Sequence, residues 1–177
     1  MLHKIFPGKM ALRPILILPD PILRARAKEI TEINGNLQTL IADMAETMYQ
    51  APGLGLAAPQ VGELHRVIVF DVSHKEGKRD LQVILNPCIS AAEGETVRTE
   101  GCLSVADFSA EVRRHARVIV KGLDQEGRPI QVDADGLLAV VLQHEIDHLD
   151  GILFIDRISR LKRALYLRKI KKQAAVR

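Results

Sequence analysis

The sequence predicts an α+β fold in which antiparallel strands wrap around a central helix bearing an HExxH motif, with a further helix at the C-terminus. Two observations predict this class. Short runs rich in β-branched residues follow one another with few helical patterns between them, and one apolar run, residues 137–142, leads directly into the motif. The chain has 177 residues, and we expect residues 1–177 to form a single domain. Its core should be aliphatic, because tryptophan is absent.

The first helix is predicted between residues 37 and 48, where apolar residues recur at helical spacing. Asn34 or Asn36 could cap its start, and the Pro-Gly pair at residues 52–53 ends it. The segment GLGLAAPQ that follows, residues 53–60, is too rich in Gly and Ala for an ordinary helix. Its glycines permit either a tight turn or a close approach of the backbone to a ligand, and the residues alone leave both open.

Five segments are predicted as strands, the first two of which are short, apolar and rich in β-branched residues. They are residues 66–72, 81–85, 97–105, 111–120 and 129–132. The linker 73–80 is polar and contains Gly77, so the first two strands are expected to pair antiparallel, and Asn86-Pro87 is expected to close the second. Residues 11–18 are also apolar and prone to β structure.

Charge is distributed unevenly along the chain. From Arg157 onward there are nine Lys or Arg and no acidic residue, whereas the preceding part has 16 basic residues against 22 acidic ones. We expect residues 159–177 to form a basic C-terminal helix that Ser159 caps. Three apolar residues of this helix are expected to face inward: Leu161, Leu165 and Ile170. The basic residues form either a solvated helix face or a contact with an anionic partner such as RNA.

The sequence contains no apolar run of the ~20 residues that span a bilayer. Residues 1–9 are basic and lack the apolar centre of a signal peptide. We expect a leader or a disordered segment there, with Met10 as an alternative start, and a cytoplasmic protein. Two cysteines are too few for a disulfide framework, and Cys88, between Pro87 and Ile89, is expected to be a small buried hydrophobe.

The motif with the most chemical content is H-E-I-D-H at residues 144–148. On a helix, positions i and i+4 lie on one face, so His144 and His148 can hold one transition-metal ion. Glu145 then points beside the ion and can act as a base on a water molecule that the ion activates. The apolar run before the motif and Gly151 after it, a helix stop, predict that this site rests on a buried helix.

A catalytic metal site needs a third protein ligand and one open position. No Glu follows Glu145, and position 154, where one HExxH protease class has a third His, is Phe, so the ligand must come from upstream. The other histidines stand alone in polar surroundings and are expected at the surface: His3, His65, His74 and His115. Cys102, in EGCLS at residues 100–104, is the better candidate, because a thiolate binds iron, zinc, cobalt or nickel strongly.

Three motifs together resemble the peptide deformylase family. They are GLGLAAPQ at residues 53–60, EGCLS at 100–104 and QHEIDHLDG at 143–151. The resemblance runs from about residue 11 to the basic C-terminal helix, which is similar to that of the bacterial and organellar branch. It implies a metal-dependent hydrolase that removes the formyl group from the N-terminal N-formylmethionine of nascent polypeptides and releases formate.

Carried over by position, the resemblance implies a role for each motif residue. The implied metal ligands are Cys102, His144 and His148. The implied catalytic residues are Glu145 as acid and base, with the Gln60 amide and the Leu103 N–H as the oxyanion hole. Leu54 and Gly55 would meet the substrate backbone, Gly53 would permit that approach, and Glu100 would belong to the same substrate-binding surface. Val140 and Val141 could line a pocket for the methionine side chain, although ordinary core packing explains them equally well.

The resemblance also implies a cofactor and partners. Fe²⁺ is expected natively, and Zn²⁺, Ni²⁺ or Co²⁺ could substitute, since the ligand set does not separate these metals. The expected partners are formylated nascent polypeptides and the ribosome, through the basic C-terminal helix, and the expected state is a monomer. Gln143 and Asp147 could orient the two imidazoles, although Asp147 could equally be an exposed carboxylate.

The sequence departs from the family pattern at two places. The family's SxP reads Ser104-Val105-Ala106 here, and Ser109 stands where many members have Arg. Both departures affect the grip on the peptide backbone rather than the chemistry. Three other interpretations were weighed: a structural zinc site that includes Cys88, an HExxH peptidase, and an RNA-binding module led by the basic tail. The two cysteines are much farther apart than the two to four residues of a structural zinc pair.

Overall fold

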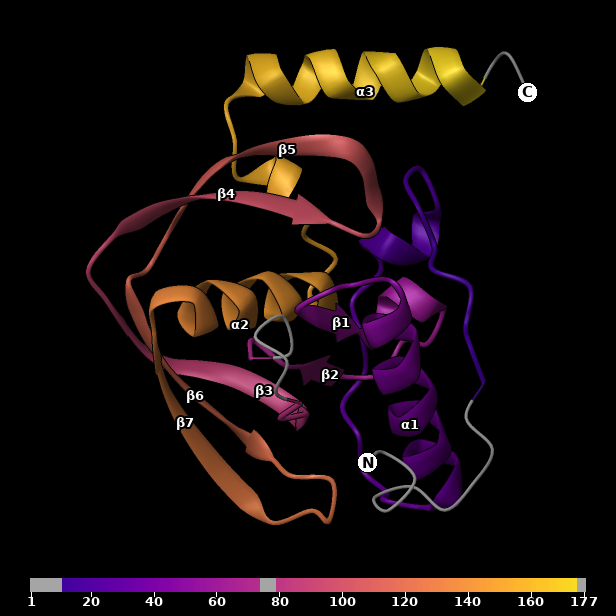
Figure 1. Cartoon of the computed structure of the whole chain (residues 1–177), viewed down its shortest axis with the longest axis vertical. Coiled ribbons are helices and arrows are strands. Elements are labelled where there is room, and N and C mark those ends of the chain that lie inside the picture. The colour runs from indigo at the N-terminus through magenta and orange to yellow at the C-terminus, as the bar shows by residue number, and fades with distance from the viewer. Residues whose placement is uncertain (1–10, 74–78, 175–177) are drawn as a thin grey trace.

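The computed structural model describes residues 11–73 and 79–174, and its fold is α+β, as predicted (Figure 1). The elements follow in this order: 3₁₀ helix η2 (Pro21–Arg24), α1 (Gly35–Gln50), β1 (Gly55–Ala57), 3₁₀ helix η3 (Ala58–Val61), β2 (Val67–Phe70), β3 (Gln82–Glu93), β4 (Thr96–Cys102), β5 (Val105–Arg114), β6 (Arg117–Leu123), β7 (Pro129–Asp135), α2 (Gly136–Leu149), 3₁₀ helix η5 (Phe154–Asp156) and α3 (Arg160–Ala174). No helix in the described ranges has the length and apolarity needed to cross a membrane.

Two antiparallel sheets lie on either side of α2 (Figure 1). The larger sheet has five strands in the order β1-β2-β3-β6-β7, and the smaller one consists of β4 and β5 alone. Strands β2 and β3 pair antiparallel, as predicted. The HExxH helix therefore lies between two layers of strands, and the smaller sheet can bring residues of its turn onto that helix.

Strand β2 is apolar at every position because both of its faces are buried. Val67 and Val69 pack into the core around α1, whereas Ile68 and Phe70 pack into the core around α2. Successive strand residues point to opposite faces, so the two helices cover opposite faces of the large sheet at this strand. Helix α1 begins where Asn34 accepts a hydrogen bond from Leu37 N–H at 3.1 Å, which selects Asn34 over Asn36 as its cap.

A third core joins the small sheet to the C-terminal part of the chain. Its buried members come from β5, from η5 and its entry, and from α3: Val105, Ala110, Val112, Leu153, Phe154, Ile155 and Tyr166. The prediction for α3 was partly wrong: Leu161 and Leu165 are 71% and 57% exposed. Tyr166, with Leu167 and Ile170 beside it, forms the face that packs inward, because it presents an aromatic ring to the small sheet.

Strand boundaries departed from the prediction at several places. Strand β3 continues through Asn86-Pro87 to Glu93, with a bulge between Leu85 and Cys88. The Asn86 side chain bonds both the N–H and the carbonyl of Ile30, which accommodates the break in the ladder. Beyond the bulge Cys88 is exposed, so the expectation of a buried cysteine was wrong.

The predicted strand 111–120 is two strands in two sheets. Strand β5 ends at Arg114 in the small sheet, and β6 begins at Arg117 in the large one. Two residues, 115 and 116, turn the chain between the sheets, and the predicted strand ran across them. Residues 11–18 form no strand; they run as an extended segment in which Leu16 N–H bonds the Gln60 carbonyl at 2.8 Å.

Among the histidines expected at the surface, His65 and His115 are exposed. His3 and His74 lie outside the described residues, as do residues 1–9.

Candidate active site

One ligand atom each from Cys102, His144 and His148 lies within 4.8 Å of the other two. The two imidazoles project from successive turns of α2, with ring centroids 5.0 Å apart. Cys102 ends β4, and its Sγ lies 3.2 Å from His148 Nε2. Helix α2 supplies two donors through local spacing, and the small sheet supplies the third across 42 residues of chain or more.

The three residues fit a transition-metal ion. A thiolate and two imidazoles form a donor set that suits iron, zinc, cobalt and nickel. His148 is almost completely buried, and its Nδ1 has no hydrogen-bond partner among the described residues. Burial, followed by the charge of His144, lowers the pKa of His148, which keeps its imidazole neutral, the form that binds metals. Cys88 lies on exposed β3 and does not join the group.

Glu100 orients the first imidazole. His144 Nδ1 donates to Glu100 Oε2 at 2.8 Å, which leaves Nε2 of the same ring for a metal. Arg114 donates to both oxygens of Glu100, at 2.7 and 2.9 Å. Burial alone would raise the pKa of Glu100, but the hydrogen bonds from Arg114 and His144 lower it to about 2. The Glu100 carboxylate is thus engaged in holding His144, although the residue also lines the pocket.

A buried ion-pair chain extends from Glu100 to the start of the C-terminal segment. Arg114 donates to Asp147 at 2.5 Å, and Asp147 also accepts from Arg157. Asp147 is buried, so the alternative of an exposed carboxylate was wrong, and its partners among the described residues are arginines rather than an imidazole. Its effect on His144 passes through Arg114 and Glu100.

Gln143 also has another role than the one expected. Its amide accepts from His115 N–H and donates to the His115 carbonyl, both at 3.0 Å, and it donates to the Ala139 carbonyl. Gln143 therefore ties α2 to the turn at which the chain passes from the small sheet to the large one, and it does not orient an imidazole.

Glu145 lies buried beside the three candidate ligands. Its Oε2 has no hydrogen-bond partner among the described residues, and burial raises its pKa to about 7. A carboxyl group with such a pKa can accept and return a proton near neutral pH. Gly55 leaves the room that this requires, because a Cβ built there would lie 2.5 Å from Glu145 Oε1.

The Gln60 amide has a fixed orientation. Its Oε1 accepts from Ala57 N–H at 2.8 Å, and its Nε2 donates to Ser104 Oγ at 3.2 Å and to Cys102 Sγ at 3.6 Å. The amide NH₂ therefore points toward the sulfur. Leu103 follows in the turn between β4 and β5 and lines the same pocket.

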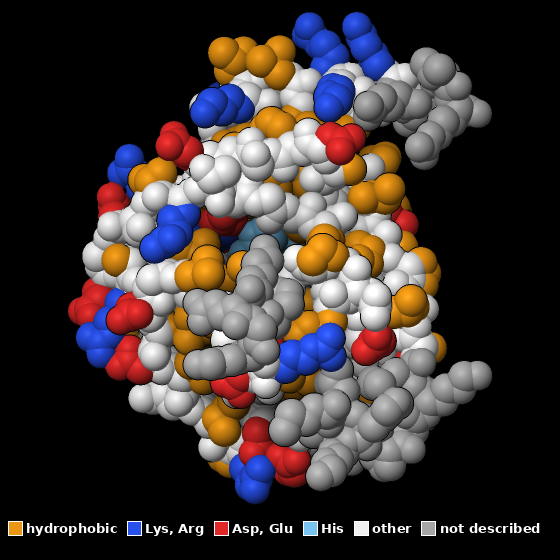
Figure 2. Space-filling view, in the orientation of Figure 1, with side chains coloured by type: hydrophobic (Ala, Val, Ile, Leu, Met, Phe, Trp, Pro, Cys, Tyr) orange, Lys and Arg blue, Asp and Glu red, His pale blue; other side chains and the backbone are white. Residues whose placement is uncertain are grey.

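A pocket of about 530 Å³ brings the predicted residues together. Among its lining residues are Gly53, Leu54, Gly55, Gln60, Glu100, Cys102, Leu103, Val140, Val141, His144 and Glu145. Figure 2 shows the hollow near the middle of this face, with a histidine side chain visible inside it. Val140 and Val141 are buried yet border the pocket, so they pack into the core and border a ligand space at once.

Sequence reasoning missed Arg114. One signal was available: Ala110, Val112 and Arg114 alternate along β5, and the inward positions of this strand are buried. An arginine in such a row must meet a buried carboxylate. The sequence did not indicate which carboxylate, because Glu100 and Asp147 come from other elements.

The fold, the open pocket and the Cys-His-His group beside a buried glutamate define a metal-dependent hydrolase of the HExxH kind. Comparison with known proteins then gives the family. Residues 12–164 match polypeptide deformylase, and the chain belongs to that family. The family's enzymes are metal-dependent hydrolases that act on nascent peptides.

Individual relatives and a solved structure support the same family assignment. The peptide deformylase of Thermodesulfovibrio yellowstonii is 56% identical over 162 residues, which cover 92% of this chain and 98% of the relative. That of Syntrophobacter fumaroxidans is 49% identical over 93% of this chain and 96% of its own length. The crystal structure of a peptide deformylase from Legionella pneumophila is similar with a TM-score of 0.86 at 47% identity, covering 94% of this chain and 97% of that one.

Proposed function

We propose that the chain carries out its family's reaction with the residues around the 530 Å³ pocket, removing the formyl group from the N-terminal N-formylmethionine of nascent polypeptides. The observation that carries this assignment is the convergence of Cys102, His144 and His148 beside Glu145, whose Oε2 has no partner among the described residues. A buried acid with a pKa near 7, next to three soft donors, suits amide hydrolysis.

In this proposal, Cys102, His144 and His148 hold one divalent ion, with Fe²⁺ as the native metal and Zn²⁺, Ni²⁺ or Co²⁺ able to replace it. When bound, the ion supplies Lewis-acid activation of water and of the formyl oxygen. Glu145 accepts the proton of the attacking water and returns it to the leaving amine. Glu100 keeps the first imidazole in the tautomer that leaves Nε2 free.

Gln60 and Leu103 are proposed as the oxyanion hole. The Gln60 NH₂ points toward Cys102, and the Leu103 N–H lies on the next residue along the turn, so both can donate to an oxygen near the ligands. One such donor is commonly worth about 10²-fold or more in rate. Ala57 holds the Gln60 amide through Oε1, which orients the donor before substrate binds.

The substrate is placed in the pocket, between residues 53–55 and residues 99–108 of the small sheet. Leu54 and Gly55 offer backbone groups at the edge of β1, and Gly53 leaves little room for a side chain, since a Cβ there would lie 3.0 Å from Leu103 Cδ1. Val140 and Val141 supply the apolar surface for the methionine side chain. A deformylase from Synechococcus elongatus, 40% identical to this chain, was crystallised in complex with actinonin.

We further propose one catalytic domain spanning residues 1–177, a monomeric state and a cytoplasmic location. The basic C-terminal helix, residues 159–177, would contact the ribosome. Basic side chains project from α3 at the top of Figure 2, and a surface of one charge favours an anionic partner. Co-sedimentation with ribosomes should weaken when Lys162 and Lys169 are both replaced by Glu; unchanged co-sedimentation would remove this part of the proposal.

The experiment for the main assignment is a formate-release assay on protein purified without oxygen. Formyl-Met-Ala-Ser should yield one formate and one new amino terminus per peptide, whereas Met-Ala-Ser should remain intact. Absence of formate, or cleavage of the unformylated peptide, would reject a deformylase and favour a peptidase instead.

A further inference from the structure

Helix α3 contacts residues of β5 that line the pocket, although α3 itself does not line it. Tyr166, on its inward face, is 4% exposed, and its hydroxyl donates to the Ala106 carbonyl at 3.3 Å. Its ring stacks on Phe108, with centroids 4.6 Å apart. Residues 105–108 of β5, here called the β5 wall, all line the pocket. One side chain of α3 thus holds two residues of this wall.

The β5 wall belongs to a sheet with little support of its own. Strands β4 and β5 pair only with each other, and an isolated two-stranded sheet is marginally stable in water. The apolar side of β5 packs on η5 and α3 in the third core. In Figure 1, α3 runs along β5 on the side away from α2. The position of the wall therefore depends on what the C-terminal segment presents to it.

Further contacts of Asp156 link the start of α3 to its surroundings. Asp156 pairs with Arg163 of α3 at 3.0 Å and with Arg24 of η2, and it also accepts from Leu153 N–H. The start of α3 is thereby tied to two other parts of the molecule. The outer face of the helix, with Leu161 and Leu165, contributes nothing to this contact because both side chains are largely exposed.

The aromatic contact also continues toward the ligands. Phe108 stacks on Phe154 with centroids 5.9 Å apart, and Phe154 stacks on His144 at 6.2 Å. Phe154 comes from η5, directly before α3, so it fills the space between the β5 wall and α2. Phe154 stacks on both Phe108 and His144, whereas the ring of Tyr166 stacks on Phe108 of the wall.

We propose that Tyr166 is a positioning residue for substrate binding: through the Ala106 carbonyl and the Phe108 ring, α3 sets the β5 wall against the peptide. This inference rests on the proposed function, because it assigns part of the peptide affinity to α3. It also gives the C-terminal helix a role in the pocket that does not depend on its basic residues.

The test compares Tyr166→Leu, Tyr166→Phe and wild type. Leu keeps apolar volume but removes the stacked ring and the hydroxyl; Phe removes the hydroxyl alone. For formyl-Met-Ala-Ser we expect Tyr166→Leu to raise KM by about tenfold with kcat within about twofold, since an aromatic pair contributes on that scale. Tyr166→Phe should raise KM by about twofold. Amide hydrogen exchange of residues 105–110 should become faster in the same order.

Leu165→Ala is the matched control, because it changes the adjacent, largely exposed residue of the same helix. Its KM and its exchange in residues 105–110 should equal those of wild type. Unchanged KM and exchange in folded Tyr166→Leu would overturn the inference, and so would a fall in kcat together with loss of bound metal, which would place the effect on the ligands. If wild type released no formate, the proposed function would fail, and the exchange comparison would still decide whether Tyr166 holds the wall.

Discussion

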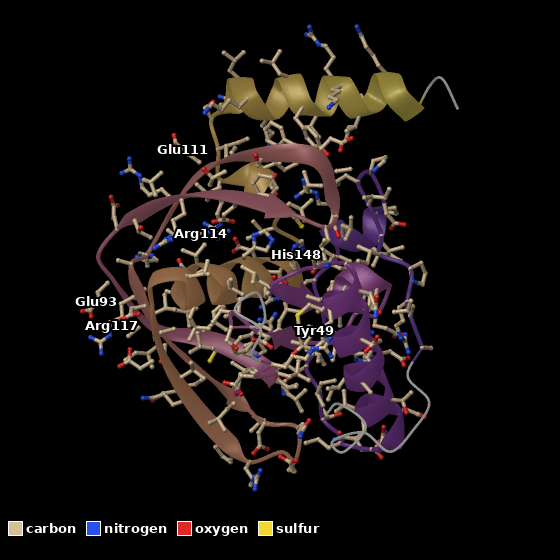
Figure 3. All side chains as sticks on the ribbon, in the orientation of Figure 1. Tyr49, Glu93, Glu111, Arg114, Arg117 and His148 are labelled. Carbon is tan, nitrogen blue, oxygen red and sulfur yellow. The ribbon has the colours of Figure 1, made fainter. Side chains whose placement is uncertain are left out.

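Arg114 and Arg117 are three residues apart, and each bridges two carboxylates, but only one of them is buried (Figure 3). Arg114, at the end of β5, binds Glu100 and Asp147, and its side chain is 2% exposed. Arg117, at the start of β6, binds Glu93 and Asp133 at the molecular edge, and its side chain is 50% exposed. All of these ion pairs have short contacts, 2.5 to 2.8 Å.

The difference between the two arginines shows that distance does not measure what an ion pair contributes. Water screens the Arg117 cluster, and exposed pairs of this kind contribute little. Around Arg114 water is excluded, so each charge depends on its partners and the loss of one leaves another unpaired. Because Glu100 also bonds His144, only the buried cluster transmits its geometry to the candidate metal site.

The largest effect on activity is expected at Glu145, whose buried Oε2 has no hydrogen-bond partner among the described residues. Glu145→Gln should fold and bind metal but lose about 10²- to 10⁴-fold in the rate of formate release, since it can no longer accept a proton. The matched change on the exposed side, Glu93→Gln, should leave the rate unchanged. Turnover of formyl-Met-Ala-Ser by Glu145→Gln at the wild-type rate would overturn the proposed role of this residue.

The next largest effect is expected on stability, and it should differ between the two arginines. Arg114→Ala should lower the free energy of unfolding by about 3–5 kcal/mol, because Glu100 and Asp147 would remain buried without their cation. Arg117→Ala should unfold at nearly the same urea concentration as wild type. Urea titrations of both variants measure this, and equal destabilisation by the two changes would refute the distinction drawn here.

A smaller effect is expected from a change at Glu100, which links the buried ion pairs of Arg114 to His144. Glu100→Gln should weaken metal binding by about 10- to 100-fold, the usual range for a group that orients a ligating His. Competition with a chelator measures the affinity, and Glu111→Gln, on the exposed side of neighbouring β5, serves as control. Equal metal affinity in Glu100→Gln and wild type would show that His144 needs no orienting carboxylate.

The smallest effect concerns pH and a buried carboxylate away from the metal site. Burial would raise the pKa of Asp71, but hydrogen bonds from Tyr49, Ser73 and Asp80 lower it overall. A lowered pKa in the folded state stabilises the protein above the unfolded pKa of about 3.9, and this stabilisation is lost as pH falls through the folded value. The Tm of Asp71→Asn should therefore lie below that of wild type at pH 7, and the gap should narrow below about pH 4. A gap that is constant from pH 7 to pH 3 would contradict this.

The features that could be predicted from the sequence are those that depend on local spacing or on a complete motif. His144 and His148 are four residues apart, so their helix brings them together whatever the rest of the chain does. Cys102 could be chosen because other third ligands were missing. The cap of α1, narrowed to Asn34 or Asn36, and the antiparallel pair β2–β3 were equally local.

What could not be predicted depends on partners that the fold selects. Arg114 meets Glu100 and Asp147 only when the small sheet closes over α2. The inward face of α3 was misassigned for a related reason. Leu161 and Leu165 are apolar but exposed, and it is the ring of Tyr166 that packs on Phe108 of the small sheet. Which face of a helix is buried therefore depends on the surface against which the helix packs.

The most direct test of the central claim is metal content per chain in protein purified without oxygen, measured for wild type, Cys102→Ala and Cys88→Ala. The two cysteines differ in position, one within 3.2 Å of a ligand histidine and the other exposed on β3. Wild type and Cys88→Ala should carry one ion per chain, and Cys102→Ala should lose it. Full metal content in Cys102→Ala, or loss of metal in Cys88→Ala, would contradict a site built from Cys102, His144 and His148.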